Sequence, residues 1–258
     1  MNAKHTNVWI LWIMYALFSA AALTDAKLHM PPETCDGMCA VVLKIIRRER
    51  ASSSWRKYYG AVATFVQNRL GIGNVYNVHN LQTTIVEVGT CFGGNSLTLS
   101  GSFPFTLVFA VDPFLGGYDI LDVQSNKFLQ ATNSLNITKE MFSKTWADAL
   151  TYDLVKKNEK SRFGLLHDSS LSAALEFKNS SIDFLFIDGL HTYQGVRDDV
   201  KAWSSKMRNG GIIMFNDYEP GGGFFPGVKK AADEFANNSR LHLHCCIRGN
   251  NAWVQLPY

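Results

Sequence analysis

The 258-residue sequence has no excess of charge of either sign, since 25 Lys and Arg residues stand against 22 Asp and Glu residues. Proteins that bind nucleic acids usually carry a basic stripe and a more extreme balance than this net charge of +3. Internal repeats and low-complexity tracts are also absent. Hydrophobic residues make up 47% of the chain, which is enough to bury a sizeable core and excludes wholesale disorder. We therefore expect a folded α/β protein of one large or two small domains, with no nucleic-acid partner.

Long hydrophobic runs are absent except at the N-terminus. The run over residues 8–23 follows Lys4 and lies at the short edge of the roughly 17–25 residues that a membrane-spanning helix needs. It ends in small residues, and Ala20 and Ala22 have the spacing of a signal-peptidase site. The sequence predicts that residues 1–26 are a secretory signal peptide. An uncleaved signal anchor is the alternative, and only in that case would a membrane be a partner.

Three N-glycosylation sequons agree with a secretory compartment. They begin at Asn136, Asn179 and Asn237. Short sequons arise by chance, but three of them beside a leader reinforce each other. We therefore predict a glycoprotein that is secreted or resides in the Golgi lumen.

The chain has few cysteines, and their number is odd. The five cysteines are Cys35, Cys39, Cys91, Cys245 and Cys246. At least one must stay outside intramolecular disulfides, and Cys91, inside a glycine-rich turn, is our candidate. Cys35 and Cys39 can pair with each other or with the Cys245–Cys246 segment, and the sequence leaves this open. A zinc site made by Cys35, Cys39, His242 and His244 is a weaker alternative in an oxidising compartment.

Two helices are predicted before a region where apolar strands alternate with helices. The first two helices span residues 39–50 and 55–70, and they carry a basic cluster that we interpret as a solvated face. That cluster comprises Lys44, Arg47, Arg48, Arg50, Arg56 and Lys57. Buried strands are predicted at residues 84–88, 106–112, 162–167, 182–188 and 211–216, and a terminal hairpin at 241–247 and 252–256.

This pattern predicts an α/β fold with a Rossmann-like, doubly wound sheet. Helices between the strands are expected at residues 138–157, 171–177, 195–207 and 227–235. We divide the chain into the leader, an N-terminal helical extension over residues 27–80 and a main domain over residues 81–258.

Polar groups stand at the end of every predicted strand, and ligands of an open parallel sheet bind at that edge. Glu87 ends the first strand, and Gly89 and Gly93 follow it in a turn where backbone can approach a ligand. Their spacing differs from the G-x-G-x-x-G of nicotinamide enzymes. Asp112 ends the second strand, where a carboxylate can accept hydrogen bonds from both hydroxyls of a ribose.

The later strands end in further candidates. Asp168 and Ser169 follow the third strand, where they can meet the edge of an adenine ring. Asp188 and His191 follow the fourth strand, and Asp217 follows the fifth. A single polar residue at the end of a strand can be explained by hydrogen bonds that it makes to the backbone of the following loop. Polar residues at the end of every strand favour a ligand site instead.

These segments resemble the class I S-adenosylmethionine-dependent methyltransferases, and most closely their macrocin-type O-methyltransferase branch. Residues 86–96, 108–119 and 162–169 carry the resemblance, and residues 182–203, with the pattern Ile-Asp-Gly-x-His-x-Tyr, carry it most specifically. Residues 209–218 and 225–235 extend it. The resemblance implies a seven-stranded sheet whose last strand is antiparallel, with S-adenosylmethionine as cofactor.

The resemblance also implies roles for the strand-end residues. Glu87, Gly89 and Gly93 would hold the methionine end of the cofactor, Asp112 its ribose, and Asp168 with Ser169 its adenine. His191 would be the general base, with Asp188 beside the site of transfer. A histidine suits this role because its ordinary pKa of about 6.5 lets it take a proton at neutral pH.

A divalent metal such as Mg²⁺ is less clearly implied. Asp188 and Asp217 match two of the ligand positions used by metal-dependent members of the class. Tyr218 stands where the third ligand is expected, and Asn216 would compensate only if the turn differs. Hard cations prefer several oxygen ligands, so the sequence leaves metal dependence open.

The function predicted from these residues is methyl transfer to a hydroxyl of a sugar or small molecule in the secretory pathway. The acceptor would bind near residues 113–154, which are rich in aromatic side chains, under a glycine-rich flap at residues 221–225. A secreted, non-catalytic binding protein on the same fold is the alternative, and a nicotinamide-dependent oxidoreductase is a more distant one. The oligomeric state is not predicted.

Overall fold

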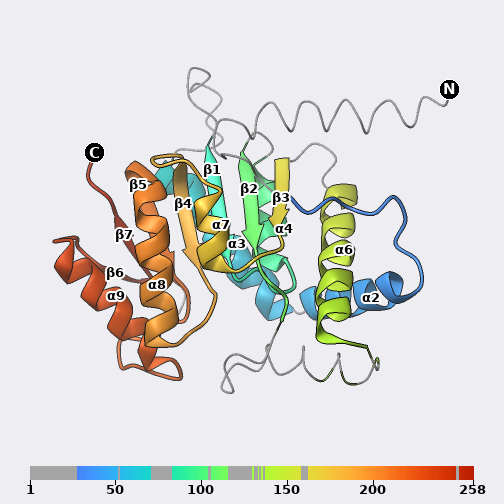
Figure 1. Cartoon of the computed structure of the whole chain (residues 1–258). Helices are drawn as coiled ribbons and strands as arrows, with labels where there is room; N and C mark the ends of the chain where they lie inside the picture. The colour runs from blue at the N-terminus through green and yellow to red at the C-terminus, as the bar shows by residue number, and fades with distance from the viewer. Residues whose placement is uncertain are drawn as a thin grey trace.

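The computed structural model describes residues 28–51, 53–70, 83–103, 106–115, 137–157, 162–247 and 250–258, together with residues 130, 133 and 135 (Figure 1). The predicted leader at residues 1–26 and the sequon at Asn136 lie outside the described residues. Within the described part of the chain, none of the helices combines the length and the apolar character that crossing a membrane requires.

Seven strands form one mixed sheet. They are β1 (Thr84–Val88), β2 (Leu107–Val111), β3 (Arg162–Leu166), β4 (Ile182–Ile187), β5 (Met207–Phe215), β6 (His244–Ile247) and β7 (Asn251–Gln255), in the order β3-β2-β1-β4-β5-β7-β6. Strands β1 to β5 are parallel, whereas β7 runs antiparallel to both β5 and β6. This confirms the predicted Rossmann-like, doubly wound fold with an antiparallel last strand. Strand order reverses between β1 and β4, which is where such sheets bind ligands.

Helices cover both faces of the sheet (Figure 1). The described helices are α2 (Met38–Arg50), α3 (Ser53–Leu70), α4 (Gly94–Ser102), α6 (Lys139–Lys157), α7 (Ser170–Leu175), α8 (Tyr193–Trp203), the short 3₁₀ helix η1 (Ser204–Lys206) and α9 (Pro226–Asn238). Side chains of successive strand residues point to opposite faces, so Ile85 and Val86 belong to different core clusters. The Val86 cluster packs on α7, α8 and α9, and the Ile85 cluster packs on α2, α3, α4 and α6.

The basic cluster of α2 is only partly a solvated face. Arg47 and Arg50 both form ion pairs with Asp153 of α6, whose side chain is fully buried. The Arg50 side chain is itself 7% exposed, whereas Arg48 stays exposed as expected. The sequence interpretation was therefore wrong for Arg50, whereas Arg47 pairs with Asp153 while its side chain stays 50% exposed. A buried carboxylate needs a charged partner, and that partner lies about a hundred positions away in the chain, where no local pattern reveals it.

The cysteine pairing that the sequence left open is resolved for the described residues. Cys35 and Cys39 form a disulfide with each other that links the segment before α2 to the first turn of this helix, and the neighbouring Cys245 and Cys246 form the second. Cys91 takes part in neither, as predicted. The zinc alternative was wrong, because the sulfur atoms of Cys35 and Cys39 are bonded to each other.

Candidate active site at the carboxyl edge of the sheet

The turn after β1 is shaped by two glycines with left-handed backbone conformations. Gly89 has a φ of 87° and Gly93, the N-cap of α4, has a φ of 70°. These conformations suit glycine because it has no Cβ atom. A Cβ at Gly89 would also collide with the backbone oxygen of Asp188. The turn therefore passes directly against the end of β4, where the fourth strand delivers its polar residues.

Glu87 lies buried beneath this turn. Its Oε2 accepts hydrogen bonds from the Thr90 hydroxyl at 2.9 Å and from the Ser96 backbone N–H at 3.1 Å, and also from the Ser96 hydroxyl. Burial raises the pKa of Glu87 to about 7, although these hydrogen bonds favour its charged form. In this structure Glu87 holds the turn in shape from below. Its predicted contact with the methionine end of a cofactor stays a prediction.

Asp112, just beyond β2, ties the turn to the second strand. Its Oδ2 accepts a hydrogen bond from the Cys91 backbone N–H at 2.8 Å, and its Oδ1 accepts one from the Phe114 backbone N–H at 2.7 Å. A carboxylate oxygen has two acceptor sites, so both oxygens keep capacity for the hydroxyls of a ribose. The half-buried carboxylate is thus held in a fixed orientation at the switch point of the sheet.

Asp168 and Ser169 follow β3, and the end of this strand lies next to Asp112. The backbone N–H of Asp112 bonds to the Leu166 carbonyl at the end of β3. Ser169 is the N-cap of α7 and accepts a hydrogen bond from Ser172, and Asp168 accepts one from the Ser169 N–H at 2.6 Å. Both residues have a local structural role and remain exposed, so a contact with adenine stays a prediction.

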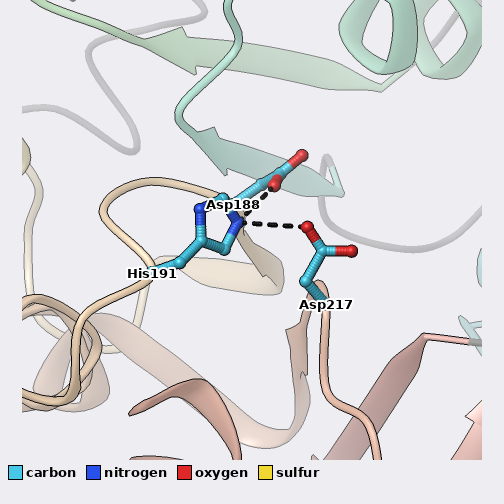
Figure 2. Close-up of side chains that lie close together, drawn as sticks. All are labelled: Asp188, His191 and Asp217. Atoms are coloured by element: carbon cyan, nitrogen blue, oxygen red, sulfur yellow. Dashed lines mark ion pairs between the residues drawn. The ribbon is translucent and has the colours of Figure 1, made fainter. Parts of the chain in front are cut away.

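Asp188, His191 and Asp217 come together at the ends of β4 and β5. Figure 2 shows the imidazole of His191 between the two carboxylates, with its Nε2 atom 3.4 Å from Asp188 Oδ1 and 3.4 Å from Asp217 Oδ2. The ring is 9% exposed and stacks on Phe225 at 4.3 Å between centroids. Thr192, the N-cap of α8, fixes the backbone directly after His191.

Burial shifts the pKa of Asp188 in this cluster. Desolvation raises the pKa of Asp188 to about 6, and the nearby Asp217 carboxylate acts in the same direction. Hydrogen bonds from His191 and Asn216 oppose this rise because they stabilise the charged form. The cluster therefore contains a carboxyl group whose pKa is raised toward neutrality, as is common at proton-transfer sites.

Tyr58 is a residue of the site that sequence reasoning missed. Its hydroxyl lies within hydrogen-bond distance of two amide oxygens, Oδ1 of Asn216 and Oδ1 of Asn251, the latter at 2.9 Å. The Asn216 Nδ2 in turn donates to Asp188 Oδ1 at 2.6 Å. Tyr58 lies on α3 and is 158 positions from Asn216 in the sequence, so only the packing of α3 against the sheet brings it here.

Tyr59 makes a second contact between α3 and the site. A Cβ at Gly94, the first residue of α4, would collide with the Tyr59 ring. The ring therefore packs against the end of the turn after β1. Together the two tyrosines make α3 one wall of the site, although the sequence assigned it to an extension outside the main domain.

Comparison with known proteins agrees with the fold. A family model described as a methyltransferase domain matches residues 86–218, which is half of the chain. The O-methyltransferase NovP is 20% identical, with 78% of this chain and 80% of that chain covered and a TM-score of 0.52. The methyltransferase PaMTH1 of Podospora anserina, solved with SAH bound, is 11% identical, with 100% and 97% covered and a TM-score of 0.52.

A curated relative gives less information. The uncharacterized protein R132 of Acanthamoeba polyphaga mimivirus is 38% identical over 53 residues, which cover 20% of this chain. The match spans only 24% of the length of that relative.

The chain belongs to the methyltransferase domain family, because the family model covers half of it and includes every predicted site residue. The predicted class of protein is thereby confirmed at the level of the family: the chain carries a methyltransferase domain. The roles of individual site residues remain predictions.

Proposed function

We propose that the chain transfers the methyl group of S-adenosylmethionine to a hydroxyl oxygen. The observation that carries this proposal is the Asp188–His191–Asp217 cluster beside the turn after β1. A hydroxyl is a poor nucleophile until it loses its proton, and this cluster places proton acceptors at the switch point of the sheet. NovP, one of the structural neighbours, is itself an O-methyltransferase.

The turn after β1 and Asp112 are suited to hold the cofactor. The turn offers backbone at the N-terminus of α4, and the fixed Asp112 carboxylate offers acceptors for the two ribose hydroxyls. Gly89 brings this turn against the backbone of Asp188. A cofactor bound there would have its sulfonium end near the cluster and its adenine toward Asp168 and Ser169.

The reaction is an in-line displacement. The acceptor oxygen forms a bond to the methyl carbon while the bond from that carbon to sulfur breaks, so that S-adenosylhomocysteine leaves. The acceptor proton passes to the cluster. Alignment of the two substrates supplies much of the rate enhancement in such a reaction, and removal of the proton supplies the rest.

The cluster can accept the proton in two ways. His191 can act as the general base, as the sequence predicts. The same three side chains also suit a divalent ion, because they offer two carboxylate oxygens and an imidazole nitrogen within 4.8 Å of one another. A bound ion would lower the pKa of a hydroxyl that coordinates it.

We further propose a sugar or small-molecule acceptor of the macrocin type. Phe224 is 77% exposed in the segment between β5 and α9, and it precedes Phe225, whose ring stacks on His191. An exposed aromatic side chain in this segment suits a sugar face or an aromatic acceptor. Phe114, Phe142 and Trp146, which the sequence placed near the acceptor, are buried in the core instead.

A secretory location is the remaining part of the proposal. The sequon residues Asn179 and Asn237 are both exposed, and the Cys35–Cys39 disulfide suits an oxidising compartment. The leader over residues 1–26 is the main support.

The test of the reaction is transfer of a labelled methyl group from S-adenosylmethionine to a panel of sugars and phenols. We expect label in at least one hydroxyl acceptor, and we expect His191→Ala to reduce turnover at least 100-fold, within the range that loss of acid–base catalysis produces. The exposed His242→Ala is the matched control and should retain wild-type turnover. Normal turnover by His191→Ala would remove the cluster from the mechanism.

A further inference from the structure

Phe114, two residues beyond Asp112, has a backbone conformation that needs support. Its φ is 47°, in the left-handed region that bulky residues rarely occupy, and the residue is 1% exposed. Such a conformation persists only where the surrounding contacts hold it. One contact is internal, because the Phe114 N–H donates to Asp112 Oδ1 at 2.7 Å. The contacts that hold this strained turn therefore also hold the Asp112 carboxylate.

A buried serine of α6 holds the same turn from outside. The Ser143 hydroxyl donates to the Pro113 carbonyl oxygen at 2.7 Å, and its Oγ lies 2.6 Å from Nε2 of His167, which follows β3. Ser143 is 3% exposed. A hydroxyl has one proton to donate, and the Pro113 carbonyl can only accept, so His167 Nε2 must be a donor. His167 therefore donates to Ser143, and Ser143 donates to Pro113.

His167 is itself held in the orientation that this donation requires. Between ring centroids it lies 5.8 Å from Phe114 and 5.5 Å from His29, which it meets edge-on. His29 is fixed at two points, because its backbone N–H donates to the Leu165 carbonyl of β3 at 2.7 Å and its Nε2 lies 2.8 Å from Asp148 Oδ1 of α6. Burial lowers the pKa of His167, and His29 acts in the same direction. The ring is therefore neutral at pH 7 and carries its proton on Nε2.

We propose that Ser143 and His167 are positioning residues for the nucleoside half of the cofactor. Their two hydrogen bonds fix the Pro113 carbonyl, and with it the strained turn that orients the Asp112 carboxylate. A ligand binds more weakly when only a fraction of the protein has the competent conformation. The two residues therefore increase cofactor affinity by keeping the turn in one conformation, and neither needs to contact the cofactor. This role rests on the function proposed above, in which Asp112 binds the ribose.

The test is calorimetric titration of the full chain with S-adenosylhomocysteine, the product that the cofactor leaves after transfer. Ser143→Ala removes one hydroxyl and should weaken binding roughly tenfold, which is the typical effect of losing one buried hydrogen bond. Thr151→Val is the matched control, because it removes another buried hydroxyl of α6, which donates to the Ala147 carbonyl of the same helix at 2.8 Å. This control should bind as the wild type does.

Two variants of His167 separate its donated hydrogen bond from its packing. His167→Leu removes the donor and should weaken binding as much as Ser143→Ala does. His167→Gln keeps an N–H donor at a similar reach and should retain most of the wild-type affinity. The double variant Ser143→Ala/His167→Leu should bind about as weakly as either single variant, because the two residues act through one chain of hydrogen bonds.

A ligand without the amino-acid part shows which half of the cofactor is affected. Methylthioadenosine keeps the ribose and the adenine, so Ser143→Ala should weaken its binding by the same factor as the binding of S-adenosylhomocysteine. A merely structural role of Ser143 would lower the unfolding temperature and leave both affinities unchanged.

Two results would overturn this assignment. One is a folded Ser143→Ala variant that binds S-adenosylhomocysteine as tightly as the wild type does. The other is a Thr151→Val variant that loses as much affinity as Ser143→Ala. Either result, with a wild type that binds the ligand, leaves the proposed methyltransferase function standing. A folded wild type that binds no S-adenosylhomocysteine would contradict that function as well.

Discussion

At the scale of single residues, Asp199 on α8 illustrates how burial affects stability. Its side chain is buried, and desolvation raises its pKa from an ordinary value of 3.8 to about 6. The folded protein therefore binds the Asp199 proton more tightly than the unfolded chain does. The stability that this group contributes is full below pH 4 and is lost as the pH rises through about 6.

Asp199→Asn keeps a neutral side chain at all pH values and should remove this loss. We expect the variant to be more stable than the wild type at pH 8, by on the order of 3 kcal/mol, with the difference shrinking toward zero at pH 4. Urea unfolding at a series of pH values measures it. An equal difference at pH 4 and pH 8 would show that Asp199 does not titrate as described.

The positions of site residues were predictable where the fold alone determines them. Asp112, Asp188 and Asp217 follow parallel strands directly, so a shared edge of the sheet was expected for them. Tyr58 could not be predicted, because its place depends on the packing of α3 and no strand-end pattern marks it. For the same reason the orientation of the Asn216 amide was not predictable.

At the scale of elements, ion pairs join α2 to α6 in addition to the apolar core that these helices share. Asp153→Ala would leave Arg50, whose side chain is 7% exposed, without its buried partner. Removing one partner of a buried ion pair costs about 3–5 kcal/mol, so we expect a loss of this size in the free energy of unfolding. Arg48→Ala, which alters an exposed pair on the same helix, should change it by less than about 0.5 kcal/mol.

Chemical denaturation of the two variants measures this difference. Comparable small losses for both would mean that α2 is docked by its apolar face alone.

Most elements were predicted to within a few residues, and the exceptions have local causes. Strand β5 begins at Met207 rather than at residue 211, because Ile182 pairs with Met207 and Phe184 with Ile212 across a register shift. Residues 208–211 include the Gly210–Gly211 pair, whose lack of side chains hides the strand pattern. In contrast, β4 at Ile182–Ile187 was predicted almost to the residue, because Asp183 alone interrupts its apolar run.

At the scale of the whole molecule, the division into an extension and a main domain does not describe the packing. The Ile85 core cluster joins α2 and α3 to the same face of the sheet as α4 and α6. This packing was not predictable from the sequence, because α2 and α3 precede the first strand. An apolar helix face alone does not indicate which face of the sheet it packs against. Contact between α3 and the site follows from this shared core.

The proposed secretory location predicts glycosylation of the exposed sequons. Expressed with its leader in a eukaryotic cell, the full chain should migrate faster on a gel after treatment with a glycosidase specific for N-linked glycans. Asn179→Gln and Asn237→Gln should each reduce that shift by one glycan. A chain that stays inside the cell with an unchanged mass would contradict the proposed location and leave the enzyme class intact.

The most direct test of the account is calorimetric titration of the full chain with S-adenosylmethionine, alongside Asp112→Ala. Two charge-assisted hydrogen bonds to a ribose are together worth a few kcal/mol, so the variant should bind the cofactor at least tenfold more weakly. Asp198→Ala, which removes a half-buried carboxylate on α8, is the control and should bind as the wild type does. Thermal unfolding verifies that each variant is folded. Saturable binding that depends on Asp112 is the predicted result, and a folded wild-type protein that binds no S-adenosylmethionine would contradict the account.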